Sequence, residues 1–214
     1  MSSCRKSLAL SVAILTVVSL LAGCGGNNRG PSFSVVADLT KLDPGLQTSI
    51  SLTSYARGYA WFEDETGGYL CVSYGNDSQT APEITSVTVD KRTLKATVAD
   101  VPVAGGAASS AAKLTVVRVD GATGVTASVT DAKGNAMVLL NPSSGIYAGQ
   151  IDGHSIEITT QGGAIAFQLA DSVLPFFTFE SPLFRNFESG DRVQFCYYRN
   201  ANDQLVITYI GSVK

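Results

Sequence analysis

The sequence predicts an all-β protein, built as a lipid-tethered β-sandwich-like domain followed by a small β-barrel. Apolar and polar side chains alternate along almost every hydrophobic segment, and Gly, Asn and Asp separate these segments at short intervals. Alternation places every second side chain on one face of a strand. Many short strands with turn residues between them are typical of sandwiches and barrels.

Several segments show the alternation most clearly. They are Thr85-Val87-Val89, Leu94-Ala96-Val98, Val125-Ala127-Val129, Ile156-Ile158, Ile165-Phe167-Leu169 and Val193-Phe195-Tyr197. One segment, 181–188, predicts a short helix instead. Ser181 can cap a helix N-terminus there, and Pro182 fits the first helical position.

The polar, turn-rich segment 141–145 predicts the boundary between two domains. We expect the sandwich-like domain over residues 33–140 and the small barrel over residues 144–214. Residues 104–112 are small and uncharged, which predicts a loop within the first domain.

The first residues predict an export signal. Arg5 and Lys6 precede the apolar run Leu8–Leu21, which is shorter than the roughly 20 apolar residues of a membrane-spanning helix. The order Leu21-Ala22-Gly23-Cys24 then resembles the lipobox of bacterial lipoproteins. The resemblance implies that the signal 1–23 is cleaved and that Cys24 carries the lipid. An ordinary secretory signal is the alternative.

A lipid on Cys24 implies that the protein lies in the bacterial cell envelope, anchored to a membrane and facing outside the cytoplasm. Residues 24–32 are rich in Gly and Asn and predict a flexible tether. Without Arg5 and Lys6 the chain keeps 13 of its 15 basic residues against 18 acidic ones, a net charge of −5. This acidic balance argues against nucleic acid as a partner.

Cys71 and Cys196 remain once Cys4 leaves with the signal and Cys24 takes the lipid. Both lie within apolar strands. A disulfide between them is one interpretation, because export exposes thiols to oxidation. Two buried free thiols are the other, because the cysteines fall in different predicted domains. Neither has a neighbouring histidine that would make it a nucleophile.

No catalytic, metal-binding or cofactor-binding residues are predicted. Gly153-His154-Ser155 is an incomplete nucleophile elbow, and His154 is the only histidine in the chain. A hairpin turn is the simpler interpretation. Glu63-Asp64-Glu65 could bind calcium but is more typical of a solvated hairpin tip. No glycine-rich phosphate motif appears.

Two aromatic groups could form binding surfaces. Tyr59, Trp61 and Phe62 lie close together before the acidic turn, and a second group lies within residues 176–187. If exposed, either group could bind a glycan or a protein partner. The alternative is that these rings fill the cores of the two domains.

Two resemblances extend this interpretation. Gly68-Tyr-Leu-Cys-Val-Ser-Tyr-Gly-Asn, Ile84-Thr-Ser-Val and Lys113-Leu-Thr-Val-Val-Arg-Val119 resemble the PrcB-like domain of protease-associated lipoproteins, over about residues 57–120. That resemblance implies a non-catalytic protein that stabilises a larger assembly. Gly145-Ile-Tyr-Ala-Gly-Gln-Ile151 and Gly190-Asp-Arg-Val-Gln-Phe195 are similar to small five-stranded OB-type barrels, over about residues 145–214.

Together these observations favour a non-enzymatic binding or accessory protein of the cell envelope, with a protein partner. Binding of a cell-wall glycan or small ligand through Tyr59 and Trp61 is the alternative. A hydrolase that uses Ser155 or carboxylates is a third hypothesis.

Overall fold

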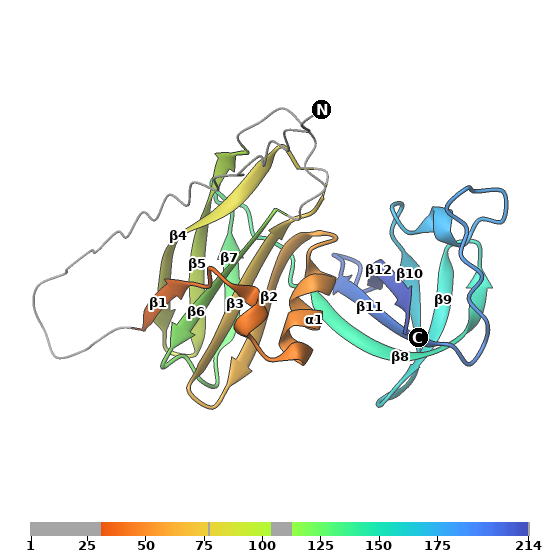
Figure 1. Cartoon of the computed structure of the whole chain (residues 1–214), viewed down its shortest axis with the longest axis horizontal. Helices are drawn as coiled ribbons and strands as arrows, with labels where there is room; N and C mark the ends of the chain where they lie inside the picture. The colour runs from red at the N-terminus through yellow and green to blue at the C-terminus, as the bar shows by residue number, and fades with distance from the viewer. Residues whose placement is uncertain (1–30, 77, 104–112, 214) are drawn as a thin grey trace, which may run out of the picture.

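Two β-structured domains lie side by side along the long axis of the molecule, with helix α1 (Pro44–Thr53) between them (Figure 1). The computed structural model describes residues 31–76, 78–103 and 113–213, and it confirms the all-β prediction. The predicted signal, Cys24, most of the tether and the predicted loop 104–112 lie outside these residues. Among the described residues, no helix is both long and apolar enough to cross a membrane.

The first domain contains two sheets. A four-stranded sheet has the order β1-β6-β3-β2, and a three-stranded sheet has the order β4-β5-β7. The strands are β1 (Ser32–Val35), β2 (Arg57–Asp64), β3 (Gly67–Tyr74), β4 (Thr80–Asp90), β5 (Thr93–Pro102), β6 (Leu114–Asp120) and β7 (Thr126–Thr130). Most neighbouring strands are antiparallel, while β5 and β7 are parallel.

The two sheets share one hydrophobic core, as expected of a sandwich. Leu70 and Val72 of β3 pack with Leu94 and Val98 of β5, and none of these four side chains is exposed. Their spacing of two or four residues places each pair on the inner face of its strand. The alternation seen in the sequence is therefore the pattern of this core.

The outer face of the four-stranded sheet is covered by η1 (Leu39–Lys41) and α1 (Pro44–Thr53), neither of which the sequence predicted. The Asp43 carboxylate caps α1 and accepts a hydrogen bond from the Gly45 N–H at 2.8 Å. Ile50 then packs against Ala60 and Cys71 of the sheet. The domain is thus a sandwich with a helix on one outer face.

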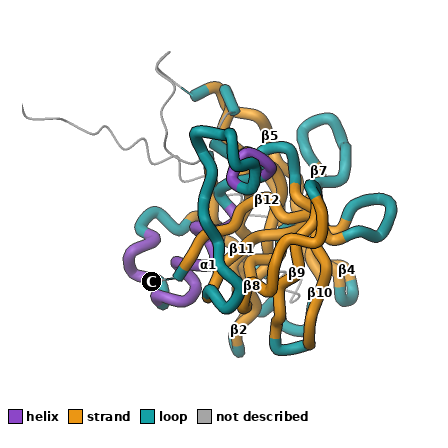
Figure 2. The backbone as a smooth tube through the Cα atoms, turned by 90° about the vertical axis from the view of Figure 1, so that its right-hand side faces the viewer, coloured by secondary structure: helices purple, strands orange, loops and turns teal. Residues whose placement is uncertain are grey.

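The second domain is a closed barrel with the strand order β10-β12-β11-β8-β9. Figure 2 shows it from the barrel end of the molecule. Its elements are β8 (Asn141–Asp152), β9 (Ser155–Thr160), β10 (Gly163–Leu169), η2 (Leu174–Phe176), β11 (Arg192–Arg199) and β12 (Leu205–Ser212). Phe167, Phe195 and Ile207 fill the interior.

The position of the domain boundary differs from the prediction. Segment 141–145 is not a turn between domains but the first part of β8, where it pairs with β11. The barrel therefore begins at Asn141 rather than at residue 144. Pro142 is compatible with this strand because it lies near the strand's start.

The helix predicted over 181–188 is wrong. Ser181 does form a turn, because the Phe184 N–H donates to its carbonyl. The turn does not continue, since the Arg185 N–H donates to the Phe176 carbonyl. Phe187 then packs against the barrel core. A short helix would gain few hydrogen bonds of its own, so the packing of the loop's aromatic rings onto the barrel is the more stable arrangement.

Gly145 allows β8 to cross close to β9. A Cβ at this position would lie 2.6 Å from Ile158 Cγ2 and 2.7 Å from the Thr159 carbonyl oxygen. We expect Gly145→Ala to lower the free energy of unfolding by about 1–3 kcal/mol, because the backbone must move. Gly153→Ala is the control, since a Cβ there meets nothing within 4 Å. Equal denaturation midpoints for both variants would contradict this account.

Candidate functional site

The aromatic residues predicted as a binding surface lie mainly inside the first domain. Tyr59 is 6% exposed, and its hydroxyl donates to the Ala127 carbonyl at 2.7 Å. The Trp61 ring packs against the same core and lies over Gly68. Phe62 points to the opposite face of the sheet, beneath the helical cover. These three rings therefore do not form a common surface.

Cys71 and Cys196 are both free and buried. Burial raises the pKa of each thiol to about 12. The Cys71 sulfur lies 3.0 Å from the Thr53 hydroxyl, and Cys196 packs against residues of the first domain. The structure thus has the free thiols of the second interpretation rather than the disulfide.

His154 and Ser155 lie in different surroundings. His154 is exposed in the turn between β8 and β9, where its backbone N–H donates to the Asp152 carboxylate at 2.8 Å. Ser155 begins β9 and is buried. No histidine can act as a base for Ser155, because the chain has no other histidine and the neighbouring one faces solvent. The incomplete elbow is a hairpin turn.

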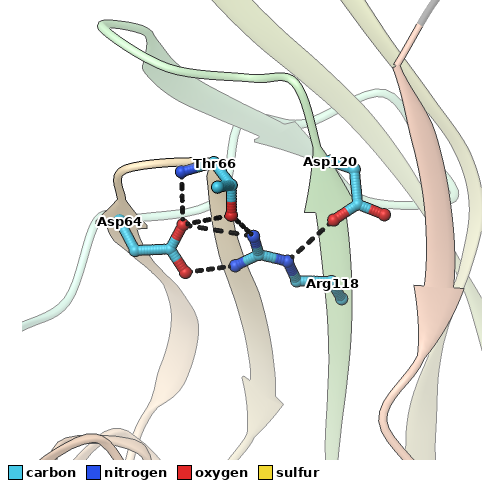
Figure 3. Close-up of polar contacts among 4 residues, drawn as sticks. All are labelled: Asp64, Thr66, Arg118 and Asp120. Atoms are coloured by element: carbon cyan, nitrogen blue, oxygen red, sulfur yellow. Dashed lines mark hydrogen bonds and ion pairs between the residues drawn. The ribbon is translucent and has the colours of Figure 1, made fainter.

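The acidic turn before β3 forms an ion-pair network around Arg118 (Figure 3). The Arg118 guanidinium donates to both Asp64 carboxylate oxygens and to the Thr66 hydroxyl at 2.6 Å. Its Nε donates to Asp120 at 2.9 Å, and its guanidinium lies 4.8 Å from the centre of the Tyr69 ring. These hydrogen bonds hold the pKa of Asp64 well below its usual range and raise the pKa of Arg118.

The network joins the β2–β3 turn to β6 and engages Asp64, the middle carboxylate of the acidic turn. Within the described ranges, no three His, Cys, Asp or Glu side chains converge as metal ligands would. The arrangement is that of a stabilised hairpin tip.

A long loop joins β10 to β11 at the far end of the barrel (Figure 1). Phe179 is 79% exposed and meets Phe184 edge to face, with ring centres 5.4 Å apart. Leu183, between them in the loop, is 55% exposed. We call these three residues the aromatic tip. The sequence placed Phe179 and Phe184 among candidate surface aromatics, and these two do reach solvent.

The junction of the two domains is a second candidate region. Leu52 of α1, Leu140 of the linker 131–140 between β7 and β8, and Cys196 of β11 form one buried cluster. Beside it, Tyr55 and Tyr209 stack with ring centres 3.9 Å apart. A cleft of about 580 Å³ opens next to this cluster, between α1, β8, β11 and the β9–β10 turn. Sequence reasoning missed it because its walls come from both domains.

One comparison with known proteins bears on the second domain. Residues 141–211 match the LytA beta-barrel domain. The match begins at the residue where β8 begins, and together with the closed five-stranded barrel it confirms the predicted OB-like architecture. No curated protein and no solved structure matches the chain. The PrcB-like resemblance over residues 57–120 stays a prediction.

The Asp64–Arg118 pair generates a prediction about pH. We expect Asp64→Asn to lower the free energy of unfolding by up to about 1 kcal/mol at pH 7, since the pair is partly exposed. The folded pKa of Asp64 lies below the unfolded value, so the ionised carboxylate stabilises the fold above about pH 4. The contribution disappears as the pH falls through the lower, folded pKa.

Denaturant unfolding of both proteins between pH 2 and pH 8 measures this difference. Asp90→Asn is the control, because Asp90 makes a single, more exposed pair with Lys95. A difference between wild type and Asp64→Asn that stays constant down to pH 2 would contradict the assignment.

Proposed function

We propose that this protein is a non-enzymatic binding module of the bacterial cell envelope, anchored through a lipid on Cys24, that holds a protein partner through the aromatic tip. The exposed cluster of Phe179, Leu183 and Phe184 carries the proposal, because apolar side chains that are exposed together mark interaction surfaces. Aromatic side chains also dominate the binding energy of many protein interfaces.

The base of the loop is held firmly to the barrel. Phe177 and Phe187 stack with ring centres 5.2 Å apart, and both contact the buried Tyr147. The Arg185 guanidinium lies 4.4 Å from the centre of the Phe176 ring and donates to the Ile210 carbonyl. A rigid base beneath an exposed tip lowers the entropic cost of binding.

The charges of the loop indicate the chemistry of the partner. Glu180 follows Phe179 directly, and the loop also contains Asp171, Glu188 and Asp191 against the single base Arg185. An anionic membrane surface would repel these acidic residues, which argues against a membrane as the partner of the aromatic tip. A protein with an apolar pocket bordered by Lys or Arg complements it.

Two observations support a role without catalysis. Ser155 is buried at the start of a strand while His154 faces solvent, so the form of the hydrolase hypothesis that uses Ser155 loses its motive. Tyr59 and Trp61 pack in the sandwich core, so they provide no platform for a glycan. The aromatic tip is the better supported binding surface.

Partner binding can be measured with a photo-crosslinking residue placed at position 183 in cells. We expect Phe179→Ser combined with Phe184→Ser to lower the yield of a discrete adduct by at least about tenfold, because two anchor rings are lost. Ile151→Ser is the control, since Ile151 is an equally apolar, 55% exposed residue elsewhere on the barrel. An unchanged adduct in the double variant would contradict the proposal.

The lipid anchor gives a separate prediction. Cells supplied with a clickable fatty-acid analogue should label the wild-type protein but not Cys24→Ala, because lipidation needs the thiol. Cys4→Ala is the matched control and should label normally, since Cys4 lies within the predicted signal. Equal labelling of Cys24→Ala and wild type would rule the anchor out.

A further inference from the structure

The outer face of the barrel between β8 and β11 is only partly covered by the first domain. Along this face the paired residues are Cys196 with Pro142, Gln194 with Ser144, and Arg192 with Ile146. Paired residues of antiparallel strands point to the same side. The first pair lies at the junction with α1, where Cys196 is fully buried.

The second pair, Ser144 and Gln194, lies where this cover ends, and both residues line the junction cleft. Thr48 and Ser49 of α1 and Gln161 of the β9–β10 turn also line the cleft. Leu52 and Pro142 contribute apolar surface. None of the residues that line this cleft carries a charge.

The polar groups of the cleft are available to a ligand. Within the described part of the chain, no hydrogen bond uses the side chain of Ser144, Gln161 or Gln194. Thr48 and Ser49 each donate to a carbonyl of their own helix at 3.0 Å, which leaves their oxygens free to accept. Side-chain groups that can donate hydrogen bonds and groups that can accept them therefore lie together in the cleft.

A second hollow of about 630 Å³ continues the cleft along the barrel. It shares Ser144, Thr160, Gln161 and Gln194 with the first, and its further lining residues include Ile146 and Arg192. Arg192 is the only charged side chain among the residues that line either hollow. The two hollows share four lining residues, and we call them together the groove.

We propose that this groove binds an uncharged oligosaccharide. Sugars present hydroxyl groups at their rims and C–H groups on their faces, which matches neutral polar walls beside Leu52 and Pro142. A strongly charged ligand would lose hydration without gaining opposite charges in the junction cleft. An extended peptide usually adds to a free strand edge, and β8 and β11, which line the groove, are each paired with a neighbouring strand on both sides.

OB-type barrels commonly bind ligands on the face of their second and third strands, between the loops 1–2 and 4–5. The groove reaches only the end of the second strand, at Thr159 and Thr160, and lies away from both loops. In this barrel those loops are the turns at 153–154 and 200–204, and no residue of either lines the groove. The groove also needs α1, so the ligand would contact both domains. The inference is independent of the partner proposed for the aromatic tip.

The test uses the full chain in a detergent without sugar groups and the neutral tetramer of β-1,4-linked N-acetylglucosamine as the probe. Isothermal titration calorimetry should detect binding to the wild type. We expect Ser144→Ala combined with Gln194→Ala to weaken it by about tenfold, because two sets of hydrogen bonds are lost. Gln150→Ala is the matched control, since Gln150 is an exposed amide on the same strand outside the groove.

The Phe179→Ser variant should bind the tetramer as the wild type does, which separates this result from any failure of partner binding. Binding that is absent in the wild type, or unchanged in the double variant, overturns the proposal. Binding of an uncharged Gly-Ser-Ala peptide in the groove, with no binding of the tetramer, also overturns it.

Discussion

Leu140 holds the two domains together, and the rest of the arrangement depends on how its backbone is fixed. Its N–H donates to the Tyr59 carbonyl at 2.6 Å, and the Tyr59 N–H donates to the Val138 carbonyl at 2.9 Å. The linker thus lies along the edge of β2. Gly58 makes this approach feasible, because a Cβ there would lie 2.7 Å from both Leu140 Cγ and the Val138 carbonyl oxygen.

The fixed linker determines what covers the barrel. Cys196 points away from the barrel interior, yet it is fully buried because Leu52 and Leu140 pack over it. Each domain therefore has an apolar area that only the other domain covers. The groove lies beside this contact, because the first domain covers the outward-facing pair Cys196 and Pro142 but leaves the next pair, Ser144 and Gln194, open to the cleft.

Most strands could be predicted from the sequence, because side-chain alternation is a local property that survives in both domains. The start of β8 could not, since Pro, Ser and Gly at 142–145 are also the usual residues of turns. Helix α1 gave a weak pattern, because Ser and Thr separate its few apolar residues. The burial of Tyr59 depends on the opposing sheet, and the groove depends on segments from both domains, so no local pattern could reveal either.

The position of β12 has a consequence for biosynthesis. This strand lies between β10 and β11, and its parallel contact with β10 rests on two residue pairs, Gln168 with Val206 and Leu169 with Ile207. The ring cannot close until residues 205–212 have left the ribosome and, for an exported chain, crossed the membrane. All strands of the sandwich precede this point, so the first domain can fold while the barrel is still an open sheet. During that interval the unpaired edges of β10 and β11 are exposed, which makes the time before ring closure the stage at which the barrel is most vulnerable to aggregation.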